Sequence, residues 1–248
     1  DEDKVIRLWE TAFKAKMDRR IWRWKFHDNP FGRQMMLCLN EVGEPIAMYS
    51  GIPFPANCNG ENIRMTQLID NMSHPDYRQI VSGRKGLFVQ TSEHFFDVYG
   101  GKHASVYHYG FPGLKHFKLG KLLLHYGMVS DGGAYFETVP QKQSFSFRFG
   151  LYKIEKISTF DQRFDILWNS SKADYPFSVY RDSTFLNWRF NQHPTNSYEI
   201  YAISSQKNIK AYVVILIRDN EALIVDVFSG KNTKPLKKLL VHIHDKMF

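Results

Sequence analysis

Two stretches of this chain resemble each other closely, and this repeat constrains the fold more than any other feature of the sequence. Residues 24–30 read WKFHDNP and residues 188–194 read WRFNQHP, so an aromatic residue, a base, Phe and Pro recur at the same spacing. Continuing without a gap, the apolar segment PIAMYSGI at 45–52 falls against IKAYVVIL at 209–216. Similarity kept at one offset predicts two copies of one structural unit.

Each predicted copy has the same order of elements: a helix, the W-[KR]-F-x-x-x-P segment, two or three strands, and a second helix. The strand LIDNMS of the first copy corresponds to IVDVFS of the second, with Asp70 on Asp226 once about eight residues are dropped. The second copy stops after its second helix, so we expect it to be incomplete and the chain to be a fragment of a longer protein. The predicted fold class is α+β, with domains at 1–148 and 149–248.

The repeated aromatic residues are predicted to pack in the core rather than to bind a ligand, because both copies carry them. They are Trp22, Trp24 and Phe26 in the first copy and Trp188 and Phe190 in the second. The base after the repeated tryptophan is expected to lie along apolar surface or to pair with an acid.

A basic, glycine-rich loop follows LIDNMS. It contains Arg78, Gly83, Arg84, Lys85 and Gly86. The free N–H groups of a helix's first turn attract anions, glycines let the backbone approach a ligand, and cations add charge-assisted contacts. The loop is therefore a candidate phosphate site, although it matches neither the P-loop nor the dinucleotide-binding fingerprint, and a solvated basic turn is the alternative.

A helix is predicted directly after this loop. Its apolar stripe recurs every three or four residues, at Phe88, Thr91, Phe95 and Val98. Gly100 is expected to stop it. The order strand, basic loop and helix N-terminus therefore supports the phosphate hypothesis.

The composition narrows the class of protein and its partners. The net charge of +8 favours an anionic partner, such as nucleic acid, a membrane surface or a phosphorylated cofactor, but a simple role in solubility is equally compatible with it. No apolar run approaches the roughly 20 residues of a membrane span, and the N-terminus does not resemble a signal peptide, so we expect a cytoplasmic protein. Cys38 and Cys58 have no partners at metal-binding spacing, and no metal site is predicted.

Several motifs resemble the GNAT superfamily of acyl-CoA-dependent N-acetyltransferases. They are IDNMSHPDYR before the glycine-rich turn and YGFPGLKHFKLG after the helix. WRWKFHDNPFG and FLNWRFNQHP resemble a bacterial branch with two GNAT folds in tandem. The resemblance implies mixed, centrally splayed sheets flanked by helices, and acetyl-CoA or another acyl-CoA as co-substrate. Its pantetheine arm would lie between the fourth and fifth strands.

The resemblance also assigns the cofactor contacts. The pyrophosphate would contact Gly83, Arg84, Lys85 and Gly86, with Arg78 as a further phosphate partner. The pantetheine would contact the strand edge at Asn71, Met72 and Ser73. The chain departs from the family's usual loop, since QIVS is inserted between HPDYR and GRKG and changes the spacing of the glycines.

Acyl transfer requires a base for the attacking amine and an acid for the departing thiolate. The resemblance places candidates for both at strand ends that face the cleft. Tyr109 is the candidate acid, and either Asp70 or His108 is the candidate base. Tyr107 and Tyr109 are expected on one face of their strand and His108 on the other, because strand side chains alternate.

Two other classes of function stay open. One is a tandem-GNAT transferase that uses aminoacyl-tRNA, which the net charge would suit, and the other is a noncatalytic domain that binds a nucleotide or a protein partner. Nucleic acid other than tRNA is not expected. For the enzyme, a small-molecule amine or a sugar nucleotide is the expected acceptor, and a protein amine is also open.

Overall fold

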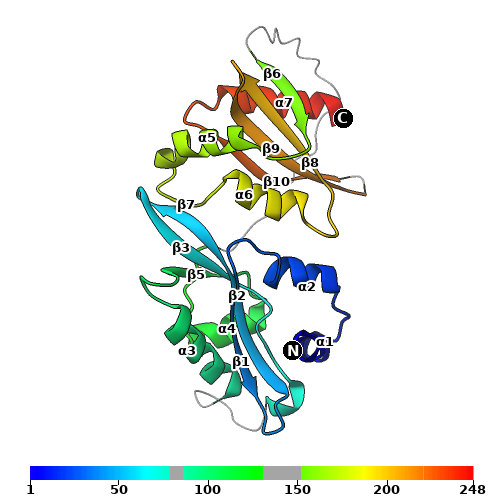
Figure 1. Ribbon diagram of the computed structural model, residues 1–248, viewed down its shortest axis with the longest axis vertical. Helices are drawn as coiled ribbons and strands as arrows, with labels where there is room; N and C mark the ends of the chain where they lie inside the picture. The colour runs from blue at the N-terminus through cyan, green and yellow to red at the C-terminus, as the bar shows by residue number, and fades with distance from the viewer. Residues whose placement is uncertain (79–85, 131–151, 220, 248) are drawn as a thin grey trace. The chain divides into compact units, whose positions relative to one another are not determined.

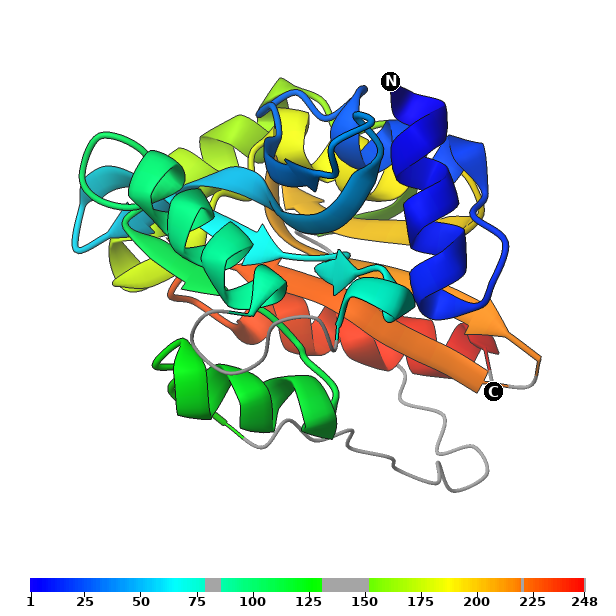
Figure 2. The same ribbon diagram turned by 90° about the horizontal axis from the view of Figure 1, so that it is seen from below.

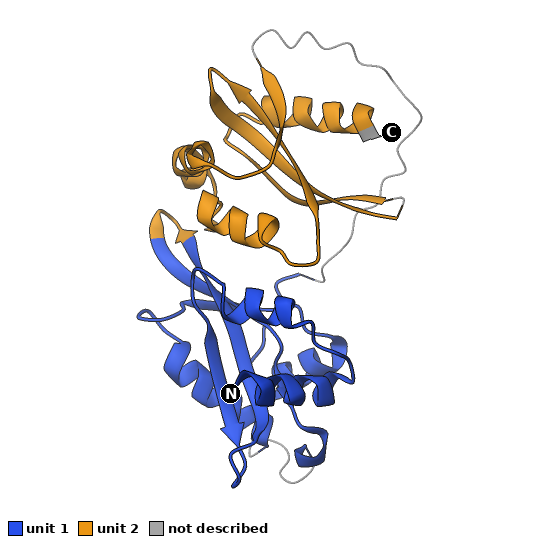
Figure 3. Ribbon diagram, turned by 45° about the vertical axis from the view of Figure 1, so that its right-hand side comes forward, with its two compact units in different colours: residues 1–56, 62–132 blue, residues 57–61, 133–248 orange. Residues whose placement is uncertain are grey.

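The computed structural model describes residues 1–78, 86–130, 152–219 and 221–247, and the chain divides into two compact units (Figure 3). Unit 1 comprises 1–56 and 62–132, and unit 2 comprises 57–61 and 133–248. The predicted boundary between residues 148 and 149 lies outside the described residues and stays a prediction.

Unit 1 is built on a mixed sheet (Figure 1). Its elements are α1 (Glu2–Phe13), α2 (Arg19–Phe26), β1 (Gln34–Leu39), β2 (Pro45–Cys58), β3 (Glu61–Leu68), β4 (Met72–Ser73), the 3-10 helix η1 (Pro75–Tyr77), α3 (Leu87–Tyr99), β5 (Tyr107–Tyr109) and α4 (Leu114–Leu123). The strand order is β1-β2-β3-β5, and the short β4 pairs with β2. β1 runs antiparallel to β2, whereas β5 runs parallel to β3.

Adjacent residues of β2 show how the helices divide between the two faces of this sheet. Met48 packs in a buried cluster with residues of α1 and α2, including Trp22. The neighbouring Tyr49 contacts Phe88 and Phe95 of α3 instead. Since successive strand side chains point to opposite faces, α1 and α2 cover one face and α3 the other, as Figures 1 and 2 show.

Helix α3 begins at Leu87 and ends at Tyr99, directly before Gly100, as predicted. Phe95 of its predicted stripe is buried, but Val98 is 56% exposed, so the stripe was wrong at this position. The buried face is centred between Ser92 and Phe95. At 3.6 residues per turn, Val98 lies about 90° from that centre and therefore faces outward.

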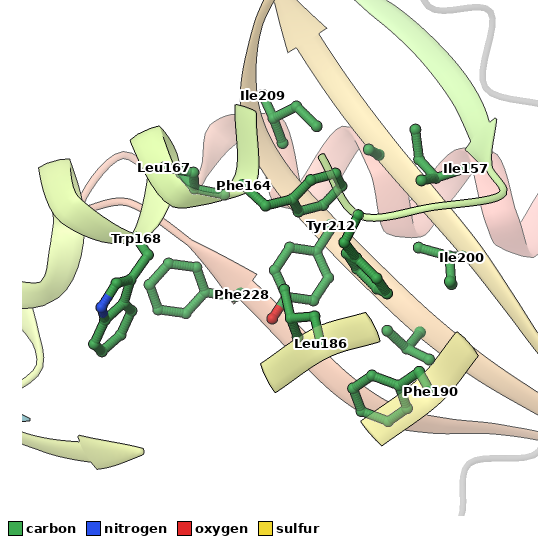
Figure 4. Close-up of a cluster of buried hydrophobic side chains, with 13 residues drawn as sticks. Ile157, Phe164, Leu167, Trp168, Leu186, Phe190, Ile200, Ile209, Tyr212 and Phe228 are labelled. Atoms are coloured by element: carbon green, nitrogen blue, oxygen red, sulfur yellow. The ribbon is translucent and has the colours of Figure 1, made fainter. Parts of the chain in front are cut away.

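Unit 2 has a comparable order of elements around an antiparallel sheet of strand order β10-β9-β8-β6. Its elements are β6 (Lys153–Ile157), α5 (Gln162–Ser171), the 3-10 helix η3 (Lys172–Asp174), β7 (Phe177–Val179), α6 (Ser183–Leu186), the π-helix η4 (Asn187–Asn191), β8 (Tyr198–Ser205), β9 (Asn208–Arg218), β10 (Glu221–Ser229) and α7 (Lys234–Met247). Tyr212 of β9 packs with Phe164 of α5 (Figure 4), whereas the neighbouring Val213 packs with Leu239 of α7. Helices therefore cover both faces of this sheet as well.

The repeated segments occupy matching places in the two units. The W-[KR]-F segment lies in α2 of unit 1 and in η4 of unit 2, and the aligned apolar segments lie in β2 and β9. The repeated aromatic side chains are all less than 9% exposed, which confirms their predicted place in the core: Trp22, Trp24, Phe26, Trp188 and Phe190. The expectation that a base after the tryptophan pairs with an acid is confirmed for Lys25, whose Nζ lies 2.8 Å from Oδ2 of Asp70.

No helix in the described part of the chain is both long enough and apolar enough to cross a bilayer.

Candidate functional site

A cavity of about 440 Å³ lies in unit 1, where β4, the first turn of α3 and helix α4 converge. Its lining residues are Asn71, Met72, Ser73, Arg78, Gly86, Leu87, Phe88, Val89, Lys115, His116, Leu119 and Leu123. Every described residue of the predicted cofactor set belongs to this lining. The remaining predicted contacts, Gly83, Arg84 and Lys85, lie outside the described residues.

The cavity wall begins at an irregular segment of the sheet, residues 69–71, which we call the 69–71 bulge. It separates β3 from β4, both of which run along β2. Ile69 N–H donates to the carbonyl of Ser50 at 3.0 Å, and Ser50 N–H donates to Oδ1 of Asn71 at 2.7 Å. The side chain of Asn71 thus takes the place of a ladder carbonyl, and Asp70 between them has a left-handed backbone with φ +52°.

The strands on the far side of the bulge separate. β3 and β5 are paired at three positions, the last of which joins Gln67 to Tyr109. β4 continues along β2, and the described part of the chain gives it no second strand partner. The predicted α+β fold with a mixed, centrally splayed sheet flanked by helices is therefore confirmed in unit 1.

Part of the cavity lining suits an anion. Gly86 caps helix α3 without a side-chain hydrogen bond, so the helix begins with backbone N–H groups and the positive end of its dipole. Arg78 is held beside it, because its Nη2 and Nε donate to the carbonyl of Ser73 at 2.8 and 3.1 Å. Lys115 of α4 adds a second positive charge. Diphosphate oxygens would find both charge and N–H donors here.

Apolar and aromatic side chains make up another part of the lining. The His116 ring lies edge-on to Phe88, with centroids 5.3 Å apart, and stacks on Tyr126 at 6.0 Å. Burial lowers the pKa of His116, so its imidazole is neutral at pH 7. The hydroxyl of Tyr126 hydrogen-bonds that of Tyr49 on β2, which ties the segment after α4 to the sheet. Burial raises the pKa of both tyrosines, and both stay uncharged.

Tyr109 and His108 lie on β5 with the predicted alternation. The Tyr109 ring is nearly parallel to that of Tyr107, with centroids 6.5 Å apart. His108 faces α3 instead, where its ring is edge-on to Phe96 at 5.1 Å and hydrogen-bonds the backbone of Tyr99. Burial lowers the pKa of His108, and its Nε2 is buried without a hydrogen-bond partner among the described residues.

Asp70 faces the other side of the sheet. Its Oδ1 accepts from Nε1 of Trp9 at 3.1 Å, and its Oδ2 from Nζ of Lys25 at 2.8 Å. The side chain is 12% exposed. The structure therefore does not bring the two base candidates together, and Asp70, His108 and Tyr109 are absent from the lining of the cavity.

Sequence reasoning missed the contribution of α4. Lys115, Leu119 and Leu123 line the cavity at a spacing of four residues, and His116 lies beside them. This spacing marks one helical face and was readable in LKHFKLGKLL. The signal was weak, because Leu114 and Leu122 of the same helix are exposed and blur the apolar stripe.

Two other features carry no comparable site. A hollow of about 500 Å³ is formed by residues 7–16 alone, and no second element converges on it. In the described part of the chain, no group of three or more His, Cys, Asp or Glu side chains is arranged to hold a metal ion.

Comparison with known proteins agrees with this geometry. Residues 1–112 match the family model described as an acetyltransferase (GNAT) domain. No curated protein sequence matches the chain significantly. Residues 1–112 are therefore similar in sequence to a GNAT acetyltransferase domain.

Solved structures extend the likeness of fold. A protein of Enterococcus faecalis V583 described as a probable N-acyltransferase has a TM-score of 0.69 at 16% identity, over 99% of this chain and 60% of that one. A GCN5-related N-acetyltransferase from Kribbella flavida has a TM-score of 0.63 at 13% identity, over 98% of this chain and 58% of that one. Saccharomyces cerevisiae N-myristoyltransferase with bound myristoyl-CoA has a TM-score of 0.54 at 11% identity, over 99% and 70%. This chain thus spans about 60% of the length of the first two proteins.

Proposed function

We propose that this chain is an acyl-CoA-dependent N-acyltransferase that transfers the acetyl group of acetyl-CoA to an amine. The observation that carries the proposal is the cavity beside the splayed strands of unit 1, whose lining includes a helix N-terminus and two cations. The similar N-acyltransferase folds, one of them with bound myristoyl-CoA, support an acyl-CoA as the co-substrate.

In this proposal the cofactor spans the cavity. The diphosphate binds at the N-terminus of α3, with Gly86 and Arg78 at that end together with Gly83, Arg84 and Lys85 of the loop. The pantetheine amides bind along β4, at Asn71, Met72 and Ser73, in the manner of an added strand. The apolar face of α4 covers the other side of the pantetheine.

The thioester would lie where β3 and β5 part, next to Tyr109. The amine nitrogen attacks the thioester carbonyl, a base takes the amine proton, and the C–S bond breaks as the new C–N bond is kept. We assign the proton for the departing thiolate to Tyr109. We assign the base to His108, which is neutral at pH 7 because burial lowers its pKa. Adjacent strand residues point to opposite faces, so the two side chains would flank a thioester held in the plane of the sheet.

We propose further that unit 2 is a partial second copy of the fold and binds no acyl-CoA. The segment after Asp226 reads VFSGKNTKPL and contains one glycine. Fewer backbone N–H groups can therefore converge on a diphosphate there than in the first copy. The acceptor in this proposal is a small amine or the amine of a sugar nucleotide.

Thermal unfolding with and without ligand tests the proposal. Acetyl-CoA at 100 times its Kd should stabilise the protein by about 2.7 kcal/mol, which raises the unfolding midpoint of a chain this size by roughly 5 to 10 °C. The absence of a shift with every acyl-CoA from acetyl to myristoyl, at millimolar concentration, would refute acyl-CoA binding. Retained binding of tRNA in that case would favour the aminoacyl-tRNA alternative.

A further inference from the structure

Asp70 does not line the cavity, but it directly precedes Asn71, which does, and its backbone belongs to the 69–71 bulge while its carboxylate bonds Trp9 and Lys25. We propose that Trp9, Lys25 and Asp70, which we call the Asp70 cluster, fix the bulge and thereby set the position of the cavity wall. Asp70 is then a positioning residue and not the catalytic base. The consequence for acyl-CoA rests on the proposed function, whereas the consequence for the bulge does not.

The bulge needs such a support. A left-handed backbone is unfavourable for a residue with a side chain, and Asp and Asn tolerate it best after Gly. At φ +52°, Asp70 adopts this conformation while its carboxylate is almost buried. A buried carboxylate must be paired, and here the partners come from two different helices, Trp9 from α1 and Lys25 from α2. Both helices therefore hold one side of the bulge.

The residues on either side of Asp70 attach to β2. Ile69 accepts from Oγ of Ser50 at 2.7 Å, and Oδ1 of Asn71 accepts from the N–H of Ser50 at 2.7 Å. Asn71 also lines the cavity. Ile69 and Asn71 are thus hydrogen-bonded to β2, whereas Asp70 between them is bonded to helices α1 and α2. Loss of the bonds between Asp70 and the two helices would let Asn71 and the start of β4 move into or away from the cavity.

Unit 2 contains an independent example of the same arrangement. The register of β9 and β10 shifts between Ile224 and Asp226. Asp226, which aligns with Asp70 in the repeat, accepts from Arg181 at 3.1 Å and from the hydroxyl of Tyr212 at 2.8 Å. An aspartate at a strand irregularity, held by one cation and one aromatic donor, therefore occurs at matching places in both units. Only the partners differ.

Hydrogen exchange of the Ser50 amide tests the proposal without any ligand. Lys25→Met and Trp9→Phe each remove one tie and keep the bulk of the side chain. Each should speed exchange of the Ser50 N–H by about fivefold to tenfold, since one hydrogen bond is lost. Lys4→Met is the matched control, because Lys4 also pairs with a carboxylate in unit 1, that of Glu44 at 2.7 Å, but on the surface. It should leave exchange unchanged.

Steady-state kinetics separate positioning from catalysis. In Lys25→Met and Trp9→Phe the KM for acetyl-CoA should rise by about fivefold to tenfold, while kcat stays within about twofold. Asp70→Asn should keep kcat within about twofold, because Asn tolerates the left-handed backbone and still accepts from Trp9, and it should raise KM about as much as Lys25→Met, because its Nδ2 cannot accept from Lys25. Asp70→Ala should show the largest rise in KM. A general base would behave differently, since Asp70→Asn would then lower kcat by about 10²-fold or more and Trp9→Phe would not.

Two outcomes would overturn the inference. One is unchanged Ser50 exchange in both Lys25→Met and Trp9→Phe. The other is a loss of kcat in Asp70→Asn at constant KM. If the wild-type chain binds no acyl-CoA, the proposed function fails, but the exchange experiment still decides whether the Asp70 cluster holds the bulge. Asp226→Asn, in unit 2, should change neither the exchange of Ser50 nor the KM.

Discussion

Removal of one hydroxyl from the Tyr49–Tyr126 pair should destabilise unit 1 more than removal of both. Tyr49 is fully buried between the sheet and α3, and its hydroxyl hydrogen-bonds that of Tyr126. In Tyr49→Phe the Tyr126 hydroxyl loses this partner, and an orphaned buried group costs about 1 to 3 kcal/mol. Tyr126→Phe orphans the Tyr49 hydroxyl, which should cost more within that range because Tyr49 is fully buried and Tyr126 is only partly buried.

The double variant, Tyr49→Phe with Tyr126→Phe, completes a double-mutant cycle. Two phenylalanine rings replace the pair and leave no orphaned hydroxyl, so the loss should fall below about 1 kcal/mol. The two single losses together should therefore exceed the loss in the double variant by about 1 to 5 kcal/mol, which is the expected coupling energy between the two sites. Hydrogen exchange of peptides from β2 during urea unfolding at neutral pH measures this in unit 1 alone. The tyrosines stay uncharged there, because burial raises the pKa of both.

The refuting result is additivity. If the double variant loses as much free energy of unfolding as the two single variants together, the hydroxyls do not stabilise each other. The tie between β2 and the segment after α4 would then lose its physical basis. A second measurement links the pair to the cavity: each single variant should weaken acetyl-CoA binding, since Tyr126 supports His116 in the cavity wall.

Four further predictions concern unit 1 and the number of acyl-CoA sites. Gly120→Ala should destabilise unit 1 in a thermal unfolding assay, because a Cβ at this position would overlap the Tyr126 ring. Replacement of glycine by alanine in a helix interior normally stabilises by about 0.5 to 1 kcal/mol. Gly127→Ala is the control and should be neutral, because a Cβ there meets open space. Arg78→Ala should weaken binding of acetyl-CoA by about tenfold but not that of S-acetylpantetheine, which lacks the diphosphate, and equal losses would indicate a damaged fold. Burial lowers the pKa of His108, so its contribution to stability is present above the unfolded-state pKa of about 6.5 and is lost as the pH falls below it. The free energy of unfolding of His108→Phe should therefore fall less steeply than that of the wild type between pH 7 and about pH 5. An unchanged pH dependence would contradict this. Calorimetry should give one acetyl-CoA per chain, and two equivalent sites would overturn the proposed asymmetry of the copies.

Local patterns in the sequence determined much of the framework. The extent of α3 followed from an apolar period that ends at Gly100, and the burial of the repeated tryptophans followed from their recurrence in both copies. The alternation of His108 and Tyr109 on β5 followed from strand geometry. These inferences depend on neighbours within a few residues. The five described residues of the predicted cofactor set came instead from the resemblance to the GNAT superfamily, and for Arg78 and Gly86 also from the order of strand, basic loop and helix start.

Only the tertiary structure decided which partners meet across the sheet. The hydroxyls of Tyr49 and Tyr126 are 77 residues apart in the chain, and the Lys25 ammonium and the Asp70 carboxylate are 45 apart. A two-residue strand period shows that neighbours face opposite ways, but it does not show which helix covers which face. Asp70 was therefore a candidate base from the sequence, whereas the structure shows its carboxylate bonded to side chains of α1 and α2. The sequence shows that a carboxylate follows strand β3, but only the packing of α1 and α2 determines that Trp9 and Lys25 are its hydrogen-bond donors.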